Sequence, residues 1–277
     1  MTTNSIDLSI IGGGVMAEAI LSRLLTRKVF AAISVLVSEP RSQRRDELVQ
    51  QYRVQVTGDN QTAISASETL LLAIKPQVFD LVVKDITPNP NSMVISILAG
   101  VTIDKLERAF PQQPVIRVMP NTPATVGRGM TAIAAGTKAL PKHIDRAKSI
   151  FNAVGEVVEV AESSMDAVTG LSGSGPAFVA LAIEALADGG VASGLSRAIA
   201  LQLAIQTVLG TATLIKETGM HPGELKDRVT SPGGTTIAGV AKLESLGFRS
   251  ALIEAVKTAT VRSKELGKSN PRYNHQQ

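Results

Sequence analysis

Two glycine-rich segments contain residue types that can hold an anion through backbone N–H groups. Residues 12–17 read Gly-Gly-Gly-Val-Met-Ala, and residues 231–236 read Ser-Pro-Gly-Gly-Thr-Thr. A pattern typical of a helix follows each segment, and the first N–H groups of a helix have no partner within it. Because glycine lacks a Cβ atom, a phosphate or a carboxylate can come close to these groups. The sequence therefore predicts two anion-binding helix starts.

The first segment fits the pattern Gly-x-Gly-x-x-Ala. Gly12 permits a tight turn, Gly14 lets the backbone approach a pyrophosphate, and Ala17 keeps the helix close to the sheet. Glycines in this pattern can also mark nothing more than a turn. Since the segment lies directly between an apolar strand pattern and a helix pattern, we favour dinucleotide binding.

The residues after the second predicted strand indicate which dinucleotide is bound. The chain reads Ser38-Glu39-Pro40-Arg41 and continues to Arg44 and Arg45. An acid here would bind the ribose diol of NAD, whereas Ser and Arg would bind the 2′-phosphate of NADP. Glu39 lies one residue beyond Ser38, which is consistent with a side chain that points away. Three arginines near one anion favour NADP, with NAD allowed as a second cofactor. Alternatively, Arg44 and Arg45 form a solvated helix face.

Further candidates follow other predicted strands, where a parallel sheet binds its ligands. Lys75-Pro76 leads the chain out of the fourth strand and is either a cofactor contact or a solvated strand end. Residues 96–100 (Ser-Ile-Leu-Ala-Gly) end the fifth strand and include small residues where a nicotinamide ring would need room. Asn60 is either a helix cap or a ligand of the adenosine half. Asn121, in Met-Pro-Asn-Thr-Pro, either faces the cofactor or belongs to a rigid turn.

In the second glycine-rich segment, Gly233 and Gly234 expose N–H groups beside the hydroxyls of Thr235 and Thr236. Such a nest suits a small carboxylate, and the hydroxyls suit a polar atom of the same ligand. The alternative is a glycine-rich loop with a threonine cap, but two glycines and two threonines exceed what a cap needs. Ser174, in a separate run of Ser, Gly and Pro, has no neighbouring base, so we reject a hydrolase nucleophile.

Composition excludes several chemistries. The 277 residues include no cysteine, which excludes disulfides, thiolate metal sites and cysteine nucleophiles. The scattered His143, His221 and His275 argue against a histidine metal centre. A net charge of +4 and an aromatic content of 3% give little for binding nucleic acid, so we expect no such partner. We find no secretory leader pattern and expect charges to interrupt every long apolar stretch, which predicts a soluble cytoplasmic protein with no membrane partner.

The elements that must position these residues are of two kinds, and the first kind occupies the chain up to about residue 160. There β-branched runs alternate with helix patterns such as residues 15–25 and 42–52. Continuous apolar strands joined by crossover helices predict an α/β fold with a doubly wound, mostly parallel sheet covered on both faces. The predicted strands are residues 6–11, 33–37, 54–57, 69–74, 93–98 and 115–119, with residues 130–134 and 157–160 at the edge.

Helices replace strands in the rest of the chain. We expect an all-α second domain over residues 162–277, after a dinucleotide-binding domain over residues 1–161. The helix expected from residue 195 is apolar nearly all round, so it must be covered on every side. A domain of about 115 residues rarely achieves that alone, which predicts a homodimer. Residues 268–277 are polar and expected to fray. The helices are expected at residues 176–191, 195–217, 237–246 and 250–266.

Taken in order along the chain, the motifs resemble those of the pyrroline-5-carboxylate reductase family. The resemblance spans residues 11–266 and implies NAD(P)H-dependent reduction of 1-pyrroline-5-carboxylate to L-proline, the last step of proline biosynthesis. It implies a Rossmann-like domain followed by a helical dimerisation domain, with dimers often assembled into decamers. The matching motifs are residues 12–17, 73–76 (Ala-Ile-Lys-Pro), 118–123 (Val-Met-Pro-Asn-Thr-Pro), 171–177, and 221–222 (His-Pro) leading into 231–236.

The resemblance also implies which residues bind each ligand. Thr236 would contact the ring nitrogen as the catalytic residue, and the protonated cyclic imine needs positioning more than a strong acid or a metal. With Arg41 from the arginine cluster, the cofactor residues are Ile11, Gly12, Gly13, Gly14, Val15, Met16, Ser38, Pro40, Arg41, Asn60, Ala73, Ile74, Lys75, Pro76, Ile97, Leu98 and Ala99. The resemblance gives Thr235 and Thr236 as substrate residues, with Glu162 as a further contact. The glycine-rich loop itself adds Ser231, Gly233 and Gly234 to this set.

Two alternatives remain open. One is a related imine reductase or a β-hydroxyacid dehydrogenase, which would use a lysine of the helical half, with Lys216 and Lys226 as candidates. The other is a non-catalytic dinucleotide sensor that binds a partner protein and would have no need of residues 233–236.

Overall fold

The computed structural model describes residues 5–84 and 86–268, and the chain divides into two compact units. The first unit comprises Met1–Gly173 and Ala259–Gln277, and the second comprises Ser174–Thr258. The sequence prediction puts the domain boundary between residues 161 and 162, where strand patterns give way to helix patterns, and this boundary stays a prediction. The predicted fraying beyond residue 268 lies outside the described residues.

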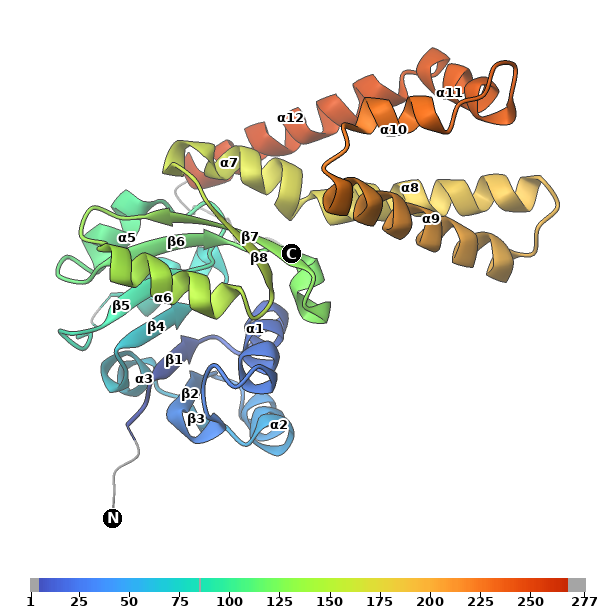
Figure 1. The fold of residues 1–277 in the computed structure, drawn as a ribbon. Coiled ribbons are helices and arrows are strands. Elements are labelled where there is room, and N and C mark those ends of the chain that lie inside the picture. Colours follow the sequence, from blue (N-terminus) through green and yellow to red (C-terminus); the bar gives the residue numbers. More distant parts are fainter. Residues whose placement is uncertain (1–4, 85, 269–277) are drawn as a thin grey trace, which may run out of the picture. The chain divides into compact units, whose positions relative to one another are not determined.

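The first unit is built on an eight-stranded sheet in the order β3-β2-β1-β4-β5-β6-β7-β8 (Figure 1). Neighbouring strands pair in parallel except for β6 and β7, which are antiparallel. The predicted mostly parallel sheet, with its two extra strands at one edge, is therefore confirmed. The strands are β1 (Leu8–Ile11), β2 (Val35–Ser38), β3 (Gln55–Thr57), β4 (Thr69–Leu72), β5 (Met93–Ser96), β6 (Val115–Met119), β7 (Gly129–Ala135) and β8 (Gly155–Glu159).

Successive side chains of each central strand enter two separate hydrophobic cores, one on each face of the sheet. Ile10 belongs to one core and its neighbour Ile11 to the other, and Leu71 and Leu72 divide in the same way. Burying such a side chain stabilises the fold by about 1.5–3 kcal/mol, which explains why these strands are apolar throughout. Helices α1 (Val15–Thr26), α2 (Ser42–Tyr52) and α6 (Pro141–Phe151) cover the first core, and α3 (Asn60–Ala66), α4 (Phe79–Val82) and α5 (Ile103–Ala109) cover the second.

Some boundaries differ from the sequence predictions. β2 begins at Val35, two residues later than predicted, because Ala32–Ser34 forms a 3₁₀ turn. β4 ends at Leu72, two residues earlier than predicted, where the chain leaves the sheet toward the 3₁₀ turn Pro76–Val78. The sequence did not predict the short helix α7 (Met165–Val168) or the π-helical turn Thr169–Gly173 that follows it.

The second unit is entirely helical, as predicted. α8 and α9 pack against each other through the small residues Ala187, Ala200 and Ala204. A hydrogen bond from Ile199 N to Ser196 Oγ caps the start of α9. The helices are α8 (Gly175–Ala192), α9 (Arg197–Thr218), α10 (Pro222–Arg228), α11 (Thr235–Ser245) and the first part of α12 (Phe248–Lys268).

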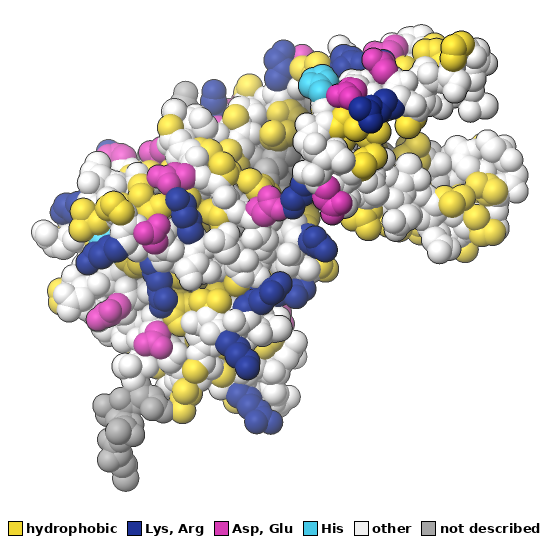
Figure 2. All heavy atoms as spheres, in the orientation of Figure 1, with side chains coloured by type: hydrophobic (Ala, Val, Ile, Leu, Met, Phe, Trp, Pro, Cys, Tyr) yellow, Lys and Arg dark blue, Asp and Glu magenta, His cyan; other side chains and the backbone are white. Residues whose placement is uncertain are grey.

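Large apolar side chains of α8 and α9 are exposed. Leu181 is 65% exposed, Leu203 53% and Leu209 58%. Figure 2 shows hydrophobic side chains on the surface of this helix pair. A soluble monomer rarely exposes so many large apolar groups together, so this surface has the character of an interface.

Two helical stretches of the described residues are long and apolar enough to cross a membrane, judged by length and composition. They are Glu162–Ala192 and Arg197–Thr218. Residues 198–215 contain no charged side chain, so the expectation that charges interrupt every long apolar stretch is wrong for this helix. Only uncharged glutamine and threonine side chains moderate its hydropathy.

The second half of α12 belongs to the first unit. Ser263 is buried there and its hydroxyl donates to Asp166 Oδ1 at 2.7 Å. Gly267 approaches Gly100 so closely that a Cβ atom on Gly100 would lie 3.3 Å from Gly267 N. The chain therefore leaves the first unit after residue 173 and returns to it at residue 259.

Candidate functional site

The predicted cofactor residues of the first unit gather at the carboxyl edge of the sheet. Gly12 N donates to Ser38 O at 2.8 Å, and Ala73 N donates to Ile11 O at 2.9 Å. β1 lies between β2 and β4, so the order of the strands reverses beside it, which is where open α/β sheets bind ligands. The fold thus brings together the ends of the four strands that carry residues 11–16, 38–41, 73–76 and 97–99.

The glycine-rich loop leaves the start of α1 open. Gly12 has a φ of +100°, and a Cβ atom there would lie 2.8 Å from Ala73 O, so this position requires glycine. Gly14 occupies the N-cap position of the 12-residue helix, and no described atom lies within 4 Å of a Cβ added to it. Val15 is 77% exposed in the first turn. This open cradle of N–H groups fits a pyrophosphate.

Glu39 does not point away from the loop, contrary to the expectation from its sequence position. Its buried carboxylate accepts hydrogen bonds from Gly13 N at 3.0 Å and from Arg41 N at 3.2 Å and Nε at 3.0 Å. β2 ends at Ser38, so strand alternation no longer fixes the direction of the next side chain. Burial acts to raise the pKa of Glu39, but the hydrogen bonds from Arg41 and Gly13 outweigh it, and the pKa is lowered.

Arg44 holds the loop from the other side. Its Nε donates to Gly13 O at 2.9 Å, and its guanidinium pairs with Glu18 on α1 and Glu47 on α2. Hydrogen bonding to Glu47, followed by that to Glu18, raises the pKa of Arg44. The interpretation of Arg44 as part of a solvated helix face is therefore wrong, because the side chain joins two helices and the loop.

Arg41 is the arginine of the predicted cluster that stays open to a ligand. Arg45 donates to Glu39 O and Pro40 O, both at 2.8 Å, and so fixes the turn. The side chain of Arg41 is 71% exposed. It borders a hollow of about 480 Å³, whose other lining residues are Pro40, Ser42, Gln43, Arg44 and Glu47. Of the three predicted arginines, Arg41 is therefore the most exposed, whereas Arg44 and Arg45 are half-buried.

Asn60 does not cap the helix that it begins. Asp59 is the cap, and its carboxylate accepts from Gln61 N at 3.2 Å and from Thr62 N at 2.8 Å. Asn60 Oδ1 instead accepts from Ser38 Oγ at 2.7 Å. The cap alternative for Asn60 is wrong, and its amide joins two positions predicted to bind the cofactor.

The remaining predicted cofactor positions differ in access. Lys75 and Ala99 are exposed, whereas Met16, Ile74, Pro76 and Ile97 are half-buried. Leu98 is buried in the second core, so only its backbone can reach a ligand. 

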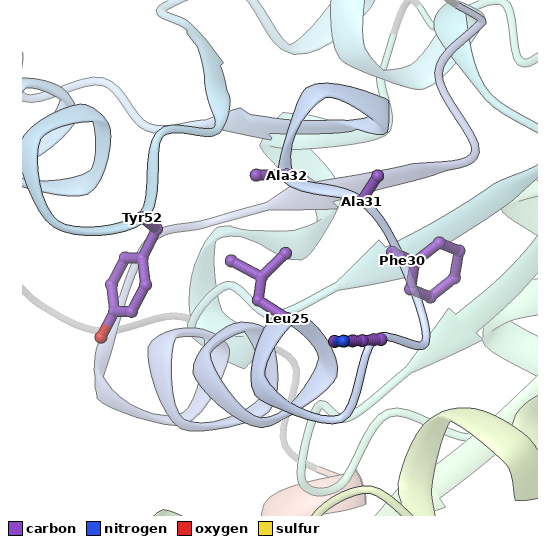
Figure 3. A pocket seen from close by; sticks show the side chains of 6 residues that line it. Leu25, Phe30, Ala31, Ala32 and Tyr52 are labelled. Carbon is purple, nitrogen blue, oxygen red and sulfur yellow. The ribbon is translucent and has the colours of Figure 1, made fainter.

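A separate hollow of about 420 Å³ lies beyond the other end of α1 (Figure 3). Its lining residues are Leu25, Lys28, Phe30, Ala31, Ala32 and Tyr52. The glycine-rich loop precedes the first turn of α1, whereas this hollow adjoins the last, so it is not part of the predicted cofactor site.

Glu162 has structural partners within the first unit. Its Oε1 accepts from Ile103 N at 2.6 Å and from Arg117 Nη1 at 3.0 Å. Ile103 begins α5, so the carboxylate caps that helix and compensates the charge of the buried Arg117 side chain. These contacts explain an acid at this position without a ligand. Its role as a substrate contact stays a prediction.

Asn121 makes a connection that sequence reasoning missed. Its Nδ2 donates to the backbone O and the Oγ of Ser172, both at 3.2 Å, and its Oδ1 accepts from Met130 N at 2.8 Å. Because both ends of the amide bind protein groups, the structure favours the rigid-turn interpretation. Ser172 lies in the motif 171–177, so the bond joins two of the motifs that carry the family resemblance.

The second glycine-rich segment begins α11 in the second unit. Gly233 has a φ of +67°, and Gly234 N donates to Ser231 O at 3.0 Å to close the turn. Gly234 is the N-cap, and Thr235 and Thr236 are the first helical residues. No described atom lies within 4 Å of a Cβ atom added to Gly233. The exposed turn has the N–H groups and hydroxyls expected of a carboxylate site.

Two family models match the chain. A model described as pyrroline-5-carboxylate reductase dimerisation matches residues 162–266. A model described as NADP oxidoreductase, coenzyme F420-dependent, matches residues 7–100. The first match includes all the helices of the second unit, and the second includes β1 to β5 with the glycine-rich loop.

Full-length relatives agree with the first model. The chain is 63% identical to a pyrroline-5-carboxylate reductase of Synechocystis sp. over 95% of this chain and 99% of the relative. It is 43% identical to that of Arabidopsis thaliana over 96% and 97%. The crystal structure of Plasmodium falciparum pyrroline carboxylate reductase with NADP bound is similar at a TM-score of 0.87, with 30% identity over 96% of this chain and 99% of that one. The chain therefore belongs to the pyrroline-5-carboxylate reductase family.

Proposed function

We propose that the protein reduces 1-pyrroline-5-carboxylate to L-proline with NAD(P)H, the final step of proline biosynthesis. The observation that carries the proposal is the 63% identity to a pyrroline-5-carboxylate reductase over 95% of the chain, a span that includes both glycine-rich helix starts. Each helix start supports one half of the reaction, because the first fits a dinucleotide and the second fits a small carboxylate.

NADP is the proposed cofactor, with NAD as a second. The open first turn of α1 fits the pyrophosphate, and exposed Arg41 beside the start of α2 fits one additional phosphate. NADP is bound in the related Plasmodium falciparum structure. When bound, the reduced cofactor supplies the hydride. Ser38 and Asn60, joined by their hydrogen bond, are proposed contacts of the adenosine half.

The Ser231–Thr236 segment is the proposed substrate site. The N–H groups at the start of α11 bind the carboxylate, and Thr236 Oγ accepts a hydrogen bond from the protonated ring nitrogen. The protonated imine carbon is already electrophilic, so these contacts orient the ring rather than activate it. Glu162 is proposed as a further substrate contact.

The test is steady-state reduction of 1-pyrroline-5-carboxylate by the purified protein with NADPH and with NADH. Thr236→Ala removes the hydroxyl and is expected to lower kcat/KM about 10- to 100-fold, the effect of losing one hydrogen bond to a charged group. Thr236→Ser keeps the hydroxyl and should recover most of the activity. An unchanged kcat/KM in Thr236→Ala would remove this residue from the mechanism.

We infer that a second copy of the chain covers the exposed apolar surface of α8 and α9. Both helices lie inside residues 162–266, the span that matches a dimerisation model. This supports a homodimer rather than a membrane as the partner of these helices. Assembly of dimers into a decamer and a cytoplasmic location are further parts of the proposal.

Leu209→Asp tests the dimer, because it would bury an unpaired charge in the interface. The dimer dissociation constant is expected to rise about 1,000-fold, or about 4 kcal/mol. Ile33→Asp is the matched control, since Ile33 is 55% exposed in the first unit and should leave the assembly unchanged. Sedimentation velocity measures both variants. A Leu209→Asp protein that stays dimeric at low concentration would place the interface elsewhere.

A further inference from the structure

We propose that Glu39 is a positioning residue that favours NADPH over NADH by holding Arg41 in place for the 2′-phosphate. The inference rests on the proposed cofactor and names a residue that determines the preference within that site. It assigns Glu39 a role opposite to that of the acid that binds the ribose diol in NAD-dependent enzymes.

Both carboxylate oxygens of Glu39 already accept hydrogen bonds from protein groups. One oxygen accepts from Gly13 N at 3.0 Å, and the other accepts from Arg41 N at 3.2 Å and from Arg41 Nε at 3.0 Å. The side chain is 7% exposed, so it has little freedom to turn toward a ribose. Glu39 therefore acts through the loop and Arg41 rather than by direct contact with a diol.

The contact to Glu39 anchors Arg41 at its Nε while the side chain stays 71% exposed. The two terminal amino groups of the guanidinium then remain available for a phosphate, which arginine binds with two parallel hydrogen bonds. An anchored arginine loses less conformational freedom on binding than a free one. Glu39 thus prepares Arg41 for a phosphate.

The surroundings of Arg41 support an anion at this place. Arg41 is the N-cap residue of the 11-residue helix α2, and its side chain makes no cap hydrogen bond. The first-turn residues Ser42 and Gln43 line the same hollow as Arg41, and the first N–H groups of a helix have no partner within it. Arg44 and Arg45 are already held by contacts to the backbone of Gly13, Glu39 and Pro40, whereas the terminal amino groups of Arg41 are not used in this way among the described residues.

A carboxylate close to a phosphate also repels it. Here three N–H groups donate to Glu39, and one of them belongs to the positively charged Arg41 side chain. The pair is neutral as a unit, so we infer that positioning outweighs repulsion. If positioning dominates, removing the charge of Glu39 weakens NADPH binding, and if repulsion dominates, removing it strengthens NADPH binding.

The experiment titrates NADPH and NADH into the full-length protein and measures each Kd from nicotinamide fluorescence. Glu39→Gln keeps an oxygen for Gly13 N but removes the charge that anchors Arg41. It is expected to raise the Kd for NADPH about 5- to 10-fold and to leave the Kd for NADH within about twofold. Arg41→Ala should raise the Kd for NADPH about 10- to 30-fold, and the double variant should match Arg41→Ala alone.

Asp46→Asn is the control. It removes one acidic charge from an exposed position of α2, the helix that Arg41 precedes, and should change neither the Kd for NADPH nor that for NADH. Three results would overturn the proposal: an equal loss of both cofactors in Glu39→Gln, a loss of NADH alone, or tighter binding of NADPH. Because binding is measured directly, a protein that binds NADPH but does not reduce 1-pyrroline-5-carboxylate would contradict only the proposed reaction. A wild-type protein that binds neither cofactor would contradict both.

Discussion

The two glycine-rich helix starts look alike in sequence but are held differently in the structure. The loop before α1 is fixed at Gly13, whose N–H donates to Glu39 and whose carbonyl accepts from Arg44, and Gly12 is closed against Ala73. In the loop before α11, the turn is closed by the bond from Gly234 N to Ser231 O, and Gly233 faces open space.

The difference shows two ways to hold a glycine-rich loop at the start of a helix. In the first unit, charged side chains hold the loop, so its shape is set before a ligand binds. The loop therefore loses little conformational entropy when the ligand binds. In the second unit, the turn is closed by its own backbone, and the neighbouring threonine hydroxyls are the proposed source of selectivity. Substitutions in the first loop should therefore affect folding and cofactor binding together, whereas those in the second should affect the substrate alone.

Gly12→Ala should have the largest effect. The new Cβ atom would lie 2.8 Å from Ala73 O at a φ of +100°, and neither the backbone nor the sheet can move away cheaply. We expect the free energy of unfolding to fall by about 2–3 kcal/mol and NADPH binding to be lost. Urea denaturation and fluorescence titration measure the two effects.

Gly127→Ala is the control for Gly12→Ala. Gly127 also has a positive φ, +71°, but the three atoms nearest to an added Cβ atom all belong to the flexible guanidinium of Arg23. Its cost should be about 1 kcal/mol, with no change in NADPH affinity. Equal losses of stability in the two variants would show that the first loop is no more tightly held than an ordinary turn.

Arg44→Met should have the next largest effect. It keeps the length of the side chain but removes the bond to Gly13 O and the ion pair with Glu18. We expect about 1.5 kcal/mol less stability and a higher KM for NADPH, with kcat little changed. Arg27→Met, at an exposed position after α1, should change neither value. A loop that tolerates Arg44→Met would not depend on side chains for its shape.

Gly233→Ala should have a smaller effect, confined to the substrate. A Cβ atom there meets no described atom within 4 Å, so the cost comes from the φ of +67° alone and should be about 1 kcal/mol. The KM for 1-pyrroline-5-carboxylate should rise while the KM for NADPH stays constant. If both KM values rose together, the second loop would not act independently.

The smallest effect should be a dependence of stability on pH. The pKa of Glu39 is lowered in the folded protein, so its contribution is present above the unfolded pKa, about 4.3, and is lost as the pH falls through the folded value. The stability difference between the wild type and Glu39→Gln should therefore shrink from about pH 6 to about pH 3. Urea denaturation across this range checks it, and a constant difference would contradict the prediction.

The sheet and the positions of the two loops were predictable because both depend on patterns that repeat along the chain. Ile10 and Ile11, for example, are apolar on successive positions because both faces of the strand are buried. The order of strands then placed residues 11–16, 38–41 and 73–76 at one edge. The helix expected from residue 195 is apolar nearly all round, and this pattern likewise predicted that a partner subunit covers it.

Side-chain directions beyond the strand ends were not predictable. Glu39 turned toward the loop, Asp59 rather than Asn60 capped α3, and Asn121 bound Ser172 across 51 positions of sequence. Each of these contacts depends on turn geometry, which leaves no periodic trace in the sequence. A cap at Asp59 could have been found, because an acidic side chain caps as readily as an amide.

The return of α12 to the first unit has a consequence for the order of synthesis. The ribosome translates the helical unit between the two parts of the first, so the sheet emerges long before the buried Ser263 that bonds to Asp166. Domains generally fold as units while the chain is being made. Here the first unit cannot be completed when its sheet emerges, because the second half of α12 is synthesised only after the whole helical unit.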